Sequence, residues 1–414
     1  MRCSAAAARC SHWRRARCGC PPGPSARTSD RSETGRANNC RRTAGPQDRR
    51  TAGPRDRRTA GTRNVRVPAV ACRRLGAICR ARSGHVILGW SEAQRTSDPN
   101  FWNLEYSHAS LPAQFGTEHV RGIELDLFPD PAGGLYGKPL VRGDAGLGPL
   151  TDPAYAAPGF KVLHWADHDY GTSCVSLTIC LRQVKQWSDA HPGHVALPIL
   201  LELKRTDPAM EARGGPKSPP WTTAMLDALD AEIRAVLPDD ATITPDDLRR
   251  PGRTLEASVL AYGWPGVGAT RGQVMFLMDN QDQMIQDAYR AGGRDSLQGR
   301  VLFTNSRPGR ADAAFVEWND PTGTNTATIQ DFVRRGYYVR TRADEPFAQA
   351  AAGDTARLRA ALDSGAQMIS TDFPVTGLAA RYGSDYTAEL PGGRIARCDP
   401  LTAPPGCRSG LLEH

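Results

Sequence analysis

The stretch "VRGIELDLF", residues 120–128, has the apolar and β-branched composition of a buried strand. Six further runs of this kind follow, at residues 160–166, 198–204, 273–279, 301–305, 337–342 and 367–374. Most are separated by stretches with a helical period, such as "TAMLDALDAEIRAVLP" and "ATIQDFVRRG". Alternating strands and helices indicate parallel strands joined by crossovers. We therefore predict an α/β protein with a (β/α)8 TIM-type barrel.

An eighth strand is expected at the start of this barrel. The run "HVILGW", residues 85–90, is the only candidate, and Gly89 and the abrupt beginning of the run make it a degraded strand. A doubly wound open sheet is the structural alternative. The sequence lacks the glycine-rich phosphate loop that usually follows the first strand of such a sheet.

The residues before this run have a different composition. Residues 1–85 carry 21 Arg and 4 acidic residues, a net charge of +17, whereas the remaining chain carries about −9. Residues 41–64 repeat an octapeptide three times and contain almost no apolar side chain. We predict that residues 1–83 are a disordered Arg-rich segment, with a gene-model artefact as the alternative, and that residues 84–414 form the barrel domain. An Arg-rich nucleic-acid binder is an alternative, but Trp13 is the only aromatic residue near these arginines, and we expect no nucleic-acid partner.

The cysteines give an indication of the redox state of the compartment in which the protein acts. Seven of the eleven precede residue 80, and the other four form two close pairs, Cys174 with Cys180 and Cys398 with Cys407. Two disulfides would suit an oxidising compartment, and free thiols are the alternative. The chain has no apolar run of 18 residues and no visible signal peptide.

Acidic residues gather where the predicted strands end. Glu124 and Asp126 lie two residues apart, so their side chains project to one face of the strand. Glu202 and Lys204 repeat this spacing on a later strand, and Asp279 ends another. Acidic side chains that meet at the open end of a barrel repel one another unless a cation lies between them. Ca²⁺ and Mg²⁺ are the cations that carboxylate ligands suit. The alternative is that each acid pairs with a neighbouring Lys or Arg.

Further ionisable side chains occur at the same strand ends. His164 follows an apolar strand and is a candidate catalytic acid or base. Lys204, Arg340 and Arg342 add positive charge, which indicates a substrate that carries phosphate. By contrast, His191 and His194 lie in a turn between a helix and a strand, where we expect solvated side chains.

Several segments, in this order, resemble one known family. They include "LEYSHASLPAQF", "VRGIELDLFPDPAGGLYG", "PGFKVLHWADHDYGTSC", "GQVMFLMDN", "GRVLFTNS" and "GAQMISTDFPV". Together, from about residue 84 to the C-terminus, they resemble the bacterial calcium-dependent phosphoinositide-specific phospholipase C family. The resemblance implies a secreted phosphoric diester hydrolase with a distorted barrel, which forms a cyclic inositol phosphate and a diacylglycerol-type alcohol.

The resemblance also implies roles for individual residues. Glu124, Asp126 and Glu202 resemble the Ca²⁺ ligands, and Glu124 or Glu202 would also be the catalytic base. His164 resembles the histidine that protonates the leaving alcohol. Lys204, Arg340 and Arg342 would bind substrate phosphate. The implied partner is a phosphoinositide lipid, bound transiently at a membrane surface by a monomeric enzyme.

One family motif is missing. The family begins its barrel with Gly-Thr-His-Asn-Ser-Tyr-His, and a register that places His85 on the last histidine puts Ala81 and Arg82 in the positions of the His and Asn. The chain as written is therefore expected to have little or no activity. The alternatives are a glycerophosphodiester phosphodiesterase and a non-catalytic barrel that binds inositol phosphates or membranes.

Overall fold

The computed structural model describes residues 75–79, 107–345 and 348–413, all of which belong to one compact unit, residues 66–414. Most of the Arg-rich segment lies outside these ranges, so its predicted disorder stays a prediction. Residues 85–90 also lie outside the described residues.

The described chain contains all seven strands that the sequence predicts from residue 120 onward. Four further strands, β1, β5, β8 and β11, were not predicted. The strands are β1 Leu75–Cys79, β2 Ile123–Asp130, β3 Gly159–Val162, β4 Leu197–Leu203, β5 Thr242–Ile243, β6 Val274–Met278, β7 Leu302–Thr304, β8 Phe315–Glu317, β9 Tyr338–Arg342, β10 Met368–Ser370 and β11 Ala396–Cys398.

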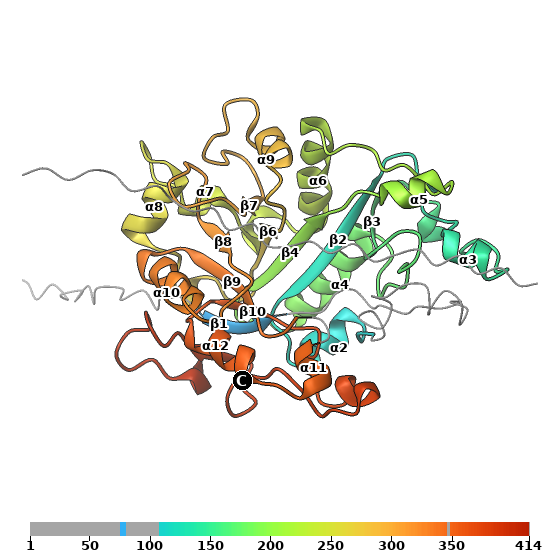
Figure 1. Cartoon of the computed structure of the whole chain (residues 1–414). Helices are drawn as coiled ribbons and strands as arrows, with labels where there is room; N and C mark the ends of the chain where they lie inside the picture. The colour runs from blue at the N-terminus through green and yellow to red at the C-terminus, as the bar shows by residue number, and fades with distance from the viewer. Residues whose placement is uncertain (1–74, 80–106, 346–347, 414) are drawn as a thin grey trace, which may run out of the picture. The chain divides into compact units, whose positions relative to one another are not determined.

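The strands form two sheets (Figure 1). In one sheet, β2, β4, β6 and β7 are parallel in that order, with β5 parallel to β6 and β3 antiparallel at the edge of β2. In the other sheet, β8, β9, β10 and β1 are parallel, and β11 is antiparallel to β1. A single parallel bridge between Asn305 and Phe315 joins the two sheets. The α/β class is therefore confirmed.

A complete barrel is not confirmed. Eight parallel strands follow one another in barrel order, from β2 through β7 and β8 to β1, but no pairing between β1 and β2 closes the ring within the described ranges. Leu75–Cys79 occupies the position of the first strand, since it pairs with β10. The prediction of a strand at residues 85–90 stays a prediction, because these residues lie outside the described ranges. The sheet thus includes residues that the predicted boundary at 83/84 assigned to the N-terminal segment.

Eleven helices connect these strands in the described chain. They are α2 Leu111–Gly116, α3 Leu140–Asp144, α4 Leu177–Ala190, α5 Pro208–Ala212, α6 Thr223–Val236, α7 Pro245–Leu248, α8 Leu255–Tyr262, α9 Gln283–Arg290, α10 Asn325–Arg335, α11 Ala348–Ala352 and α12 Ala356–Asp363. The side chains of Ser176, Thr222 and Thr254 accept hydrogen bonds from the first turns of α4, α6 and α8. Gly336 ends α10 with a φ of 125°, which favours glycine.

The alternation of side chains along β2 puts apolar residues on one face of the strand and acidic residues on the other. On β2, Ile123, Leu125 and Leu127 are fully buried and belong to one core cluster with apolar residues of α4 and α6, which lie beside β2 and β4 in Figure 1. Glu124 and Asp126 alternate with them and therefore project to the other face of the strand. Burial of one such side chain contributes ~1.5–3 kcal/mol, so this alternation fixes which face carries the acids.

Both predicted disulfides are present, between Cys174 and Cys180 and between Cys398 and Cys407. The first links the loop after β3 to the first turn of α4. Over the part of the chain that the structure covers, none of the helices combines the length and apolar character needed to cross a bilayer.

Candidate functional site

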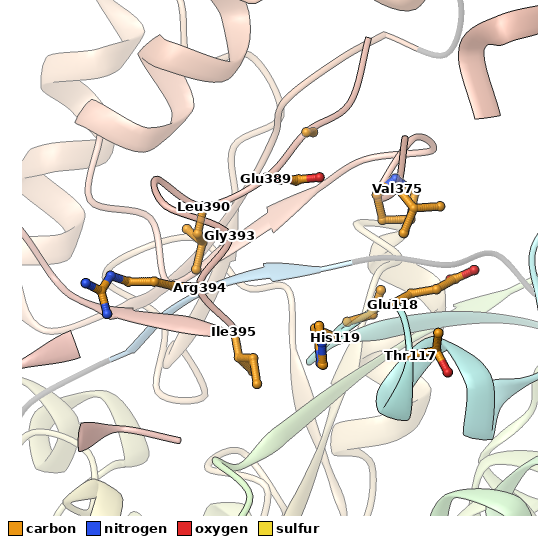
Figure 2. Close-up of a pocket in the computed structure, with 12 residues that line it drawn as sticks. Thr117, Glu118, His119, Val375, Glu389, Leu390, Gly393, Arg394 and Ile395 are labelled. Atoms are coloured by element: carbon orange, nitrogen blue, oxygen red, sulfur yellow. The ribbon is translucent and has the colours of Figure 1, made fainter. Parts of the chain in front are cut away.

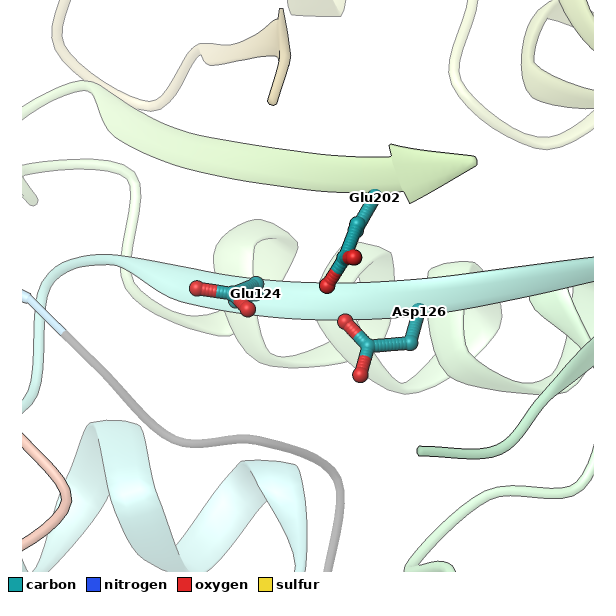
Figure 3. A group of neighbouring side chains, drawn as sticks. All are labelled: Glu124, Asp126 and Glu202. Carbon is teal, nitrogen blue, oxygen red and sulfur yellow. The ribbon is translucent and has the colours of Figure 1, made fainter. Parts of the chain in front are cut away.

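Three carboxylates meet on β2 and β4. Asp126 lies beside Glu202 in the parallel register of the two strands, and Glu124 lies two residues before Asp126. Each offers an oxygen within 4.8 Å of the others. Figure 3 shows Glu202 reaching from β4 toward the two carboxylates on β2. We call Glu124, Asp126 and Glu202 the acid cluster.

The acid cluster is mostly buried. Glu124 is 3 % and Asp126 2 % exposed, whereas the Glu202 side chain is 27 % exposed and thus forms its accessible edge. The predicted i, i+2 projection of Glu124 and Asp126 is confirmed by this geometry.

Lys204 lies next to the acid cluster. Its Nζ is 3.0 Å from Glu202 Oε2 and 3.8 Å from Asp126 Oδ2, and its side chain is 11 % exposed. Its amide donates to the carbonyl of Leu127, which holds the end of β4 against β2. The structure therefore places this predicted phosphate-binding residue beside two of the predicted metal ligands.

Arg340 on β9 contacts the acid cluster from the other sheet. Its Nη2 lies 3.2 Å from Glu124 Oε2, and its Nη1 bonds to both Glu317 and Asn319. Nε donates to Ser370 Oγ at 2.6 Å. Because the guanidinium is buried and protein oxygens accept from each of its nitrogens, this arrangement favours a role in holding Glu124. The predicted role of Arg340 in phosphate binding stays a prediction.

Asp279 follows β6, and the charged groups described above act on its carboxyl group. Burial, and then the negative charges of Glu124 and Glu202, raise the pKa of Asp279 to about 7, although Arg340 and Lys204 act to lower it. Its carboxyl group is therefore partly protonated at neutral pH, so it contributes less than a full negative charge to the site.

The charges around the acid cluster do not balance. The three acids of the cluster and Glu317 contribute four negative charges, while Lys204 and Arg340 contribute two positive charges. A divalent cation would neutralise this difference. Within the described residues, the contacts with Lys204 and Arg340 supply two of the positive charges that these four acids require.

The donor set fits a hard cation. Carboxylate oxygens bind Ca²⁺ at about 2.3–2.6 Å, so two oxygens of one site lie at most about 4.6–5.2 Å apart. The oxygens of the acid cluster fall within this limit, at 4.8 Å or less. Their all-oxygen chemistry suits Ca²⁺ or Mg²⁺ better than Zn²⁺.

His164 lies close to this cluster in the fold. It follows β3, and the amide of the preceding Leu163 donates to the carbonyl of Asp126 at 3.0 Å. Its Nδ1 lies 2.7 Å from Asp169 Oδ2, and both side chains are buried. The indole of Trp165 stacks on the imidazole, with ring centroids 5.1 Å apart. The structure thus brings the predicted catalytic histidine beside the middle of β2, next to Asp126 of the acid cluster.

Arg342 is two residues after Arg340 on β9, but it contacts different acidic residues. Its guanidinium lies 3.8 Å from Glu345 and 4.0 Å from Asp372, which follows β10. These contacts join the ends of β9 and β10. Its predicted role in binding substrate phosphate stays a prediction.

One expectation about the histidines is wrong. His194 is 1 % exposed, not solvated, because it packs beside Trp187 and lies 2.7 Å from Ser188 Oγ. Burial lowers the pKa of His194, although a hydrogen bond to the carbonyl of Val195 and the charge of Glu413 partly oppose this. His191, in the same turn, is exposed as predicted.

Two cavities among the described residues lie away from the acid cluster and His164. One of about 280 Å³, drawn in Figure 2, is lined by residues that precede β2, such as Glu118 and His119, and by residues that precede β11, such as Arg394. Burial raises the pKa of Glu118. A second, of about 530 Å³, is lined by Trp187, His191 and Arg271, among others. Neither is lined by a residue of the acid cluster or by His164.

Glu317, Asn319 and Asp169 were not identified from the sequence as part of the site. Glu317 ends β8, a strand of three residues, and its carboxylate pairs with Arg340 and accepts from Asn305. An acid at the end of the run "AAFVE" was the available signal. Asp169 lies five residues after His164, which is a spacing without any secondary-structure periodicity.

A match to a known protein family agrees with the acid cluster. A family-wide sequence model described as "Phosphoinositide phospholipase C, Ca2+-dependent" matches residues 87–400. No curated protein matches in sequence. Among solved structures, a calcium-dependent phosphoinositol-specific phospholipase C from Pseudomonas sp. is 14 % identical, with 79 % of this chain and 95 % of that chain covered and a TM-score of 0.48.

A Ca²⁺-dependent phosphatidylinositol-specific phospholipase C from Streptomyces antibioticus is 16 % identical, with 74 % of this chain and 95 % of that chain covered and a TM-score of 0.45. The family match extends over well more than half of the 414 residues. This chain therefore belongs to the Ca²⁺-dependent phosphoinositide phospholipase C family.

Proposed function

We propose that this chain is a phosphoric diester hydrolase that cleaves phosphatidylinositol-type lipids by the phospholipase C reaction. The observation that carries the proposal is the acid cluster, with three carboxylates within 4.8 Å of one another, next to the buried His164–Asp169 pair. Membership of the family supports the same reaction.

In this reaction the 2-hydroxyl oxygen of the inositol attacks the phosphorus of its own diester. The new oxygen–phosphorus bond gives a cyclic inositol phosphate, and the bond to the glycerol oxygen breaks to release diacylglycerol. The hydroxyl proton goes to a base, and the leaving oxygen receives a proton from an acid.

Glu202 is better placed than Glu124 to be the base. Glu124 is 3 % exposed and bonds to Arg340, whereas the Glu202 side chain is 27 % exposed. Both carboxylates lie beside a cation, Glu202 beside Lys204 and Glu124 beside Arg340, so the greater accessibility of Glu202 and not a difference in basicity favours it. His164 would protonate the leaving alcohol, and Lys204 and Arg342 would bind phosphate oxygens.

The acid cluster would hold Ca²⁺ through Glu124, Asp126 and Glu202. When bound, Ca²⁺ supplies positive charge that acidifies a hydroxyl group and stabilises a negatively charged phosphate. The two disulfides support a further part of the proposal, that the chain acts in an oxidising compartment, as a secreted protein would. We also propose that it acts as a monomer and binds membranes only transiently.

The test uses the full chain and vesicles of phosphatidylinositol with Ca²⁺. Phosphorus NMR should show a cyclic inositol phosphate, and both chelation of Ca²⁺ and the Glu202→Gln variant should abolish it. Glu211→Gln, on α5, is the matched control and should leave turnover unchanged. Release of a glycerophosphate or inositol without the cyclic product would instead favour a glycerophosphodiester phosphodiesterase.

A second candidate is a barrel that binds Ca²⁺ and inositol phosphates with little turnover. The sequence after β1 favours it, because Ala81 and Arg82 stand where the family has its His and Asn, and the family match begins only at residue 87. Calorimetric Ca²⁺ binding without a cyclic product would support this candidate. Absence of Ca²⁺ binding would contradict both candidates.

A further inference from the structure

We infer that Asp169 is a positioning residue for His164, which it orients and supplies with a compensating negative charge. This inference rests on the proposed function, in which His164 protonates the leaving alcohol. It goes beyond that function because it gives the proton donor a named partner on the same loop.

The two side chains form a close buried pair. Asp169 Oδ2 lies 2.7 Å from His164 Nδ1, and the side chains are 0 % and 6 % exposed. A carboxylate can only accept, so this contact requires the hydrogen to be on Nδ1. Nε2 is then the ring nitrogen that would exchange a proton with the substrate.

The backbone between the two residues fixes this contact. The amide of Asp169 donates to the carbonyl of Trp165 at 2.9 Å, and the amide of Trp165 donates to the carbonyl of Asp169 at 3.2 Å. This pair of bonds closes a tight loop that returns Asp169 to His164. The indole of Trp165 lies almost parallel to the imidazole, at an interplanar angle of 6°.

The loop is also anchored at its far end. Cys174, five residues after Asp169, is bonded to Cys180 in the first turn of α4. The hydroxyl of Tyr155 donates to the carbonyl of Tyr170, the residue after Asp169. The position of Asp169 is therefore determined from both sides, as preorganised positioning requires.

A neighbouring aspartate in the same loop has another role. Asp167 is 2 % exposed, but its Oδ1 accepts from the amide of Leu140 and its carbonyl accepts from the amide of Val141. It thus secures the start of α3 and has no recorded bond to His164 within the described residues. The two aspartates share burial, loop and residue type, so Asp167 is a matched control for Asp169.

The carboxylate of Asp169 would act in two ways. It holds the imidazole in the form with hydrogen on Nδ1, and its negative charge stabilises the doubly protonated ring from which the proton leaves. In Asp169→Asn the shape is retained, but the amide is neutral and its NH₂ group can donate to Nδ1. That contact would favour the opposite tautomer.

The first measurement is nitrogen NMR of the histidine rings in the full chain, which needs no turnover. Asp169→Asn should shift the His164 resonances toward hydrogen on Nε2, and its ring should titrate at least about one pH unit lower. Asp167→Asn should leave the His164 resonances unchanged. An unchanged His164 spectrum in folded Asp169→Asn protein would overturn the inference.

The second measurement varies the leaving group. Phosphatidylinositol releases an alkoxide that needs a proton, whereas a p-nitrophenyl ester of inositol phosphate releases a stable phenolate that does not. Asp169→Asn should lose about 100-fold or more in kcat on the lipid and much less on the aryl ester. Equal losses on both substrates would indicate a purely structural role.

The two measurements distinguish a failure of the proposed reaction from a failure of the role inferred for Asp169. If the wild-type chain cleaves neither substrate, the proposed reaction is contradicted, and the nitrogen spectra still decide whether Asp169 sets the tautomer of His164. If the wild-type chain turns over but the spectra and both rates are unchanged in Asp169→Asn, only the role of Asp169 is wrong.

Discussion

The ammonium group of Lys204 lies 3.0 Å from the carboxylate of Glu202, one of the three acids proposed to hold Ca²⁺. It is also 3.8 Å from Asp126. A fixed positive charge so close to a cation site lowers the affinity of that site through repulsion. Lys204 therefore opposes Ca²⁺ binding while it adds positive charge for a substrate phosphate.

Lys204→Met should increase the affinity of the chain for Ca²⁺. We expect the dissociation constant to fall about tenfold, which corresponds to ~1.4 kcal/mol, because the repulsion is lost and the apolar stem is kept. Calorimetric titration of the substrate-free chain measures this directly. Turnover of phosphatidylinositol should fall in the same variant, since the proposed contact between Lys204 and the substrate phosphate is lost.

The matched control is Lys185→Met, which removes an exposed lysine that pairs with Asp189 on α4. Its Ca²⁺ affinity should equal that of the wild type. Weaker Ca²⁺ binding by Lys204→Met than by wild type would show that Lys204 supports the acid cluster instead of competing with the ion.

Arg340→Met should destabilise the fold strongly. The change leaves Glu124 and Glu317 buried without the guanidinium that bridges them, and removal of one partner from a buried ion pair typically costs about 3–5 kcal/mol. Urea denaturation in the presence of a chelator gives the free energy of unfolding. Arg335→Met, at an exposed pair on α10, should change it by less than about 1 kcal/mol. Equal effects of the two variants would contradict this role of Arg340.

The acid cluster was predictable because two short-range rules act together. Parity along β2 puts Glu124 and Asp126 on one face, and the parallel register with β4 puts Glu202 beside Asp126. Both rules operate within strands of seven or eight residues whose apolar pattern is strong. The site therefore follows from the same pattern that predicts the sheet.

The surroundings of Arg340 were not predictable in this way. They depend on β8, whose three residues are too few to show a period, and on pairing with β9, which is distant from β2 in sequence. Similarly, β1 is a run of only five apolar residues between arginines, too short to be assigned from its sequence alone, and it pairs with β10 and β11 in the structure. In both cases tertiary pairing decides the structure of a short segment.

Glu413 should stabilise the C-terminal part of the chain. Its Oε1 accepts from Arg121 Nε at 2.8 Å and its Oε2 accepts from the amide of Val195 at 2.9 Å, with both charged side chains at least nine-tenths buried. Glu413→Ala leaves the Arg121 charge without this partner, so we expect a loss of about 3 kcal/mol in the free energy of unfolding. Glu389→Ala, at an exposed residue, is the control and should have almost no effect. Similar values for both variants would show that the pair contributes little.

His194 should make stability depend on pH. Because burial lowers its pKa in the folded chain, the unfolded chain binds a proton more readily once the pH falls below about 6.5, the ordinary value for histidine. The stabilisation is complete above that pH and is lost as the pH falls toward the lower, folded pKa. One proton gives a slope of up to about 1.4 kcal/mol per pH unit.

Urea denaturation at pH 7.5, 6.5 and 5.5 measures this slope. His194→Gln should be less stable than wild type at pH 7.5 and should lose less stability on acidification, because its side chain does not titrate. His191→Gln changes the exposed histidine of the same turn and should keep the wild-type slope. Because acidic groups also titrate toward pH 5.5, the difference between the two variants, not either slope alone, isolates His194. Identical slopes would mean that His194 accepts a proton in the folded chain as easily as in the unfolded chain.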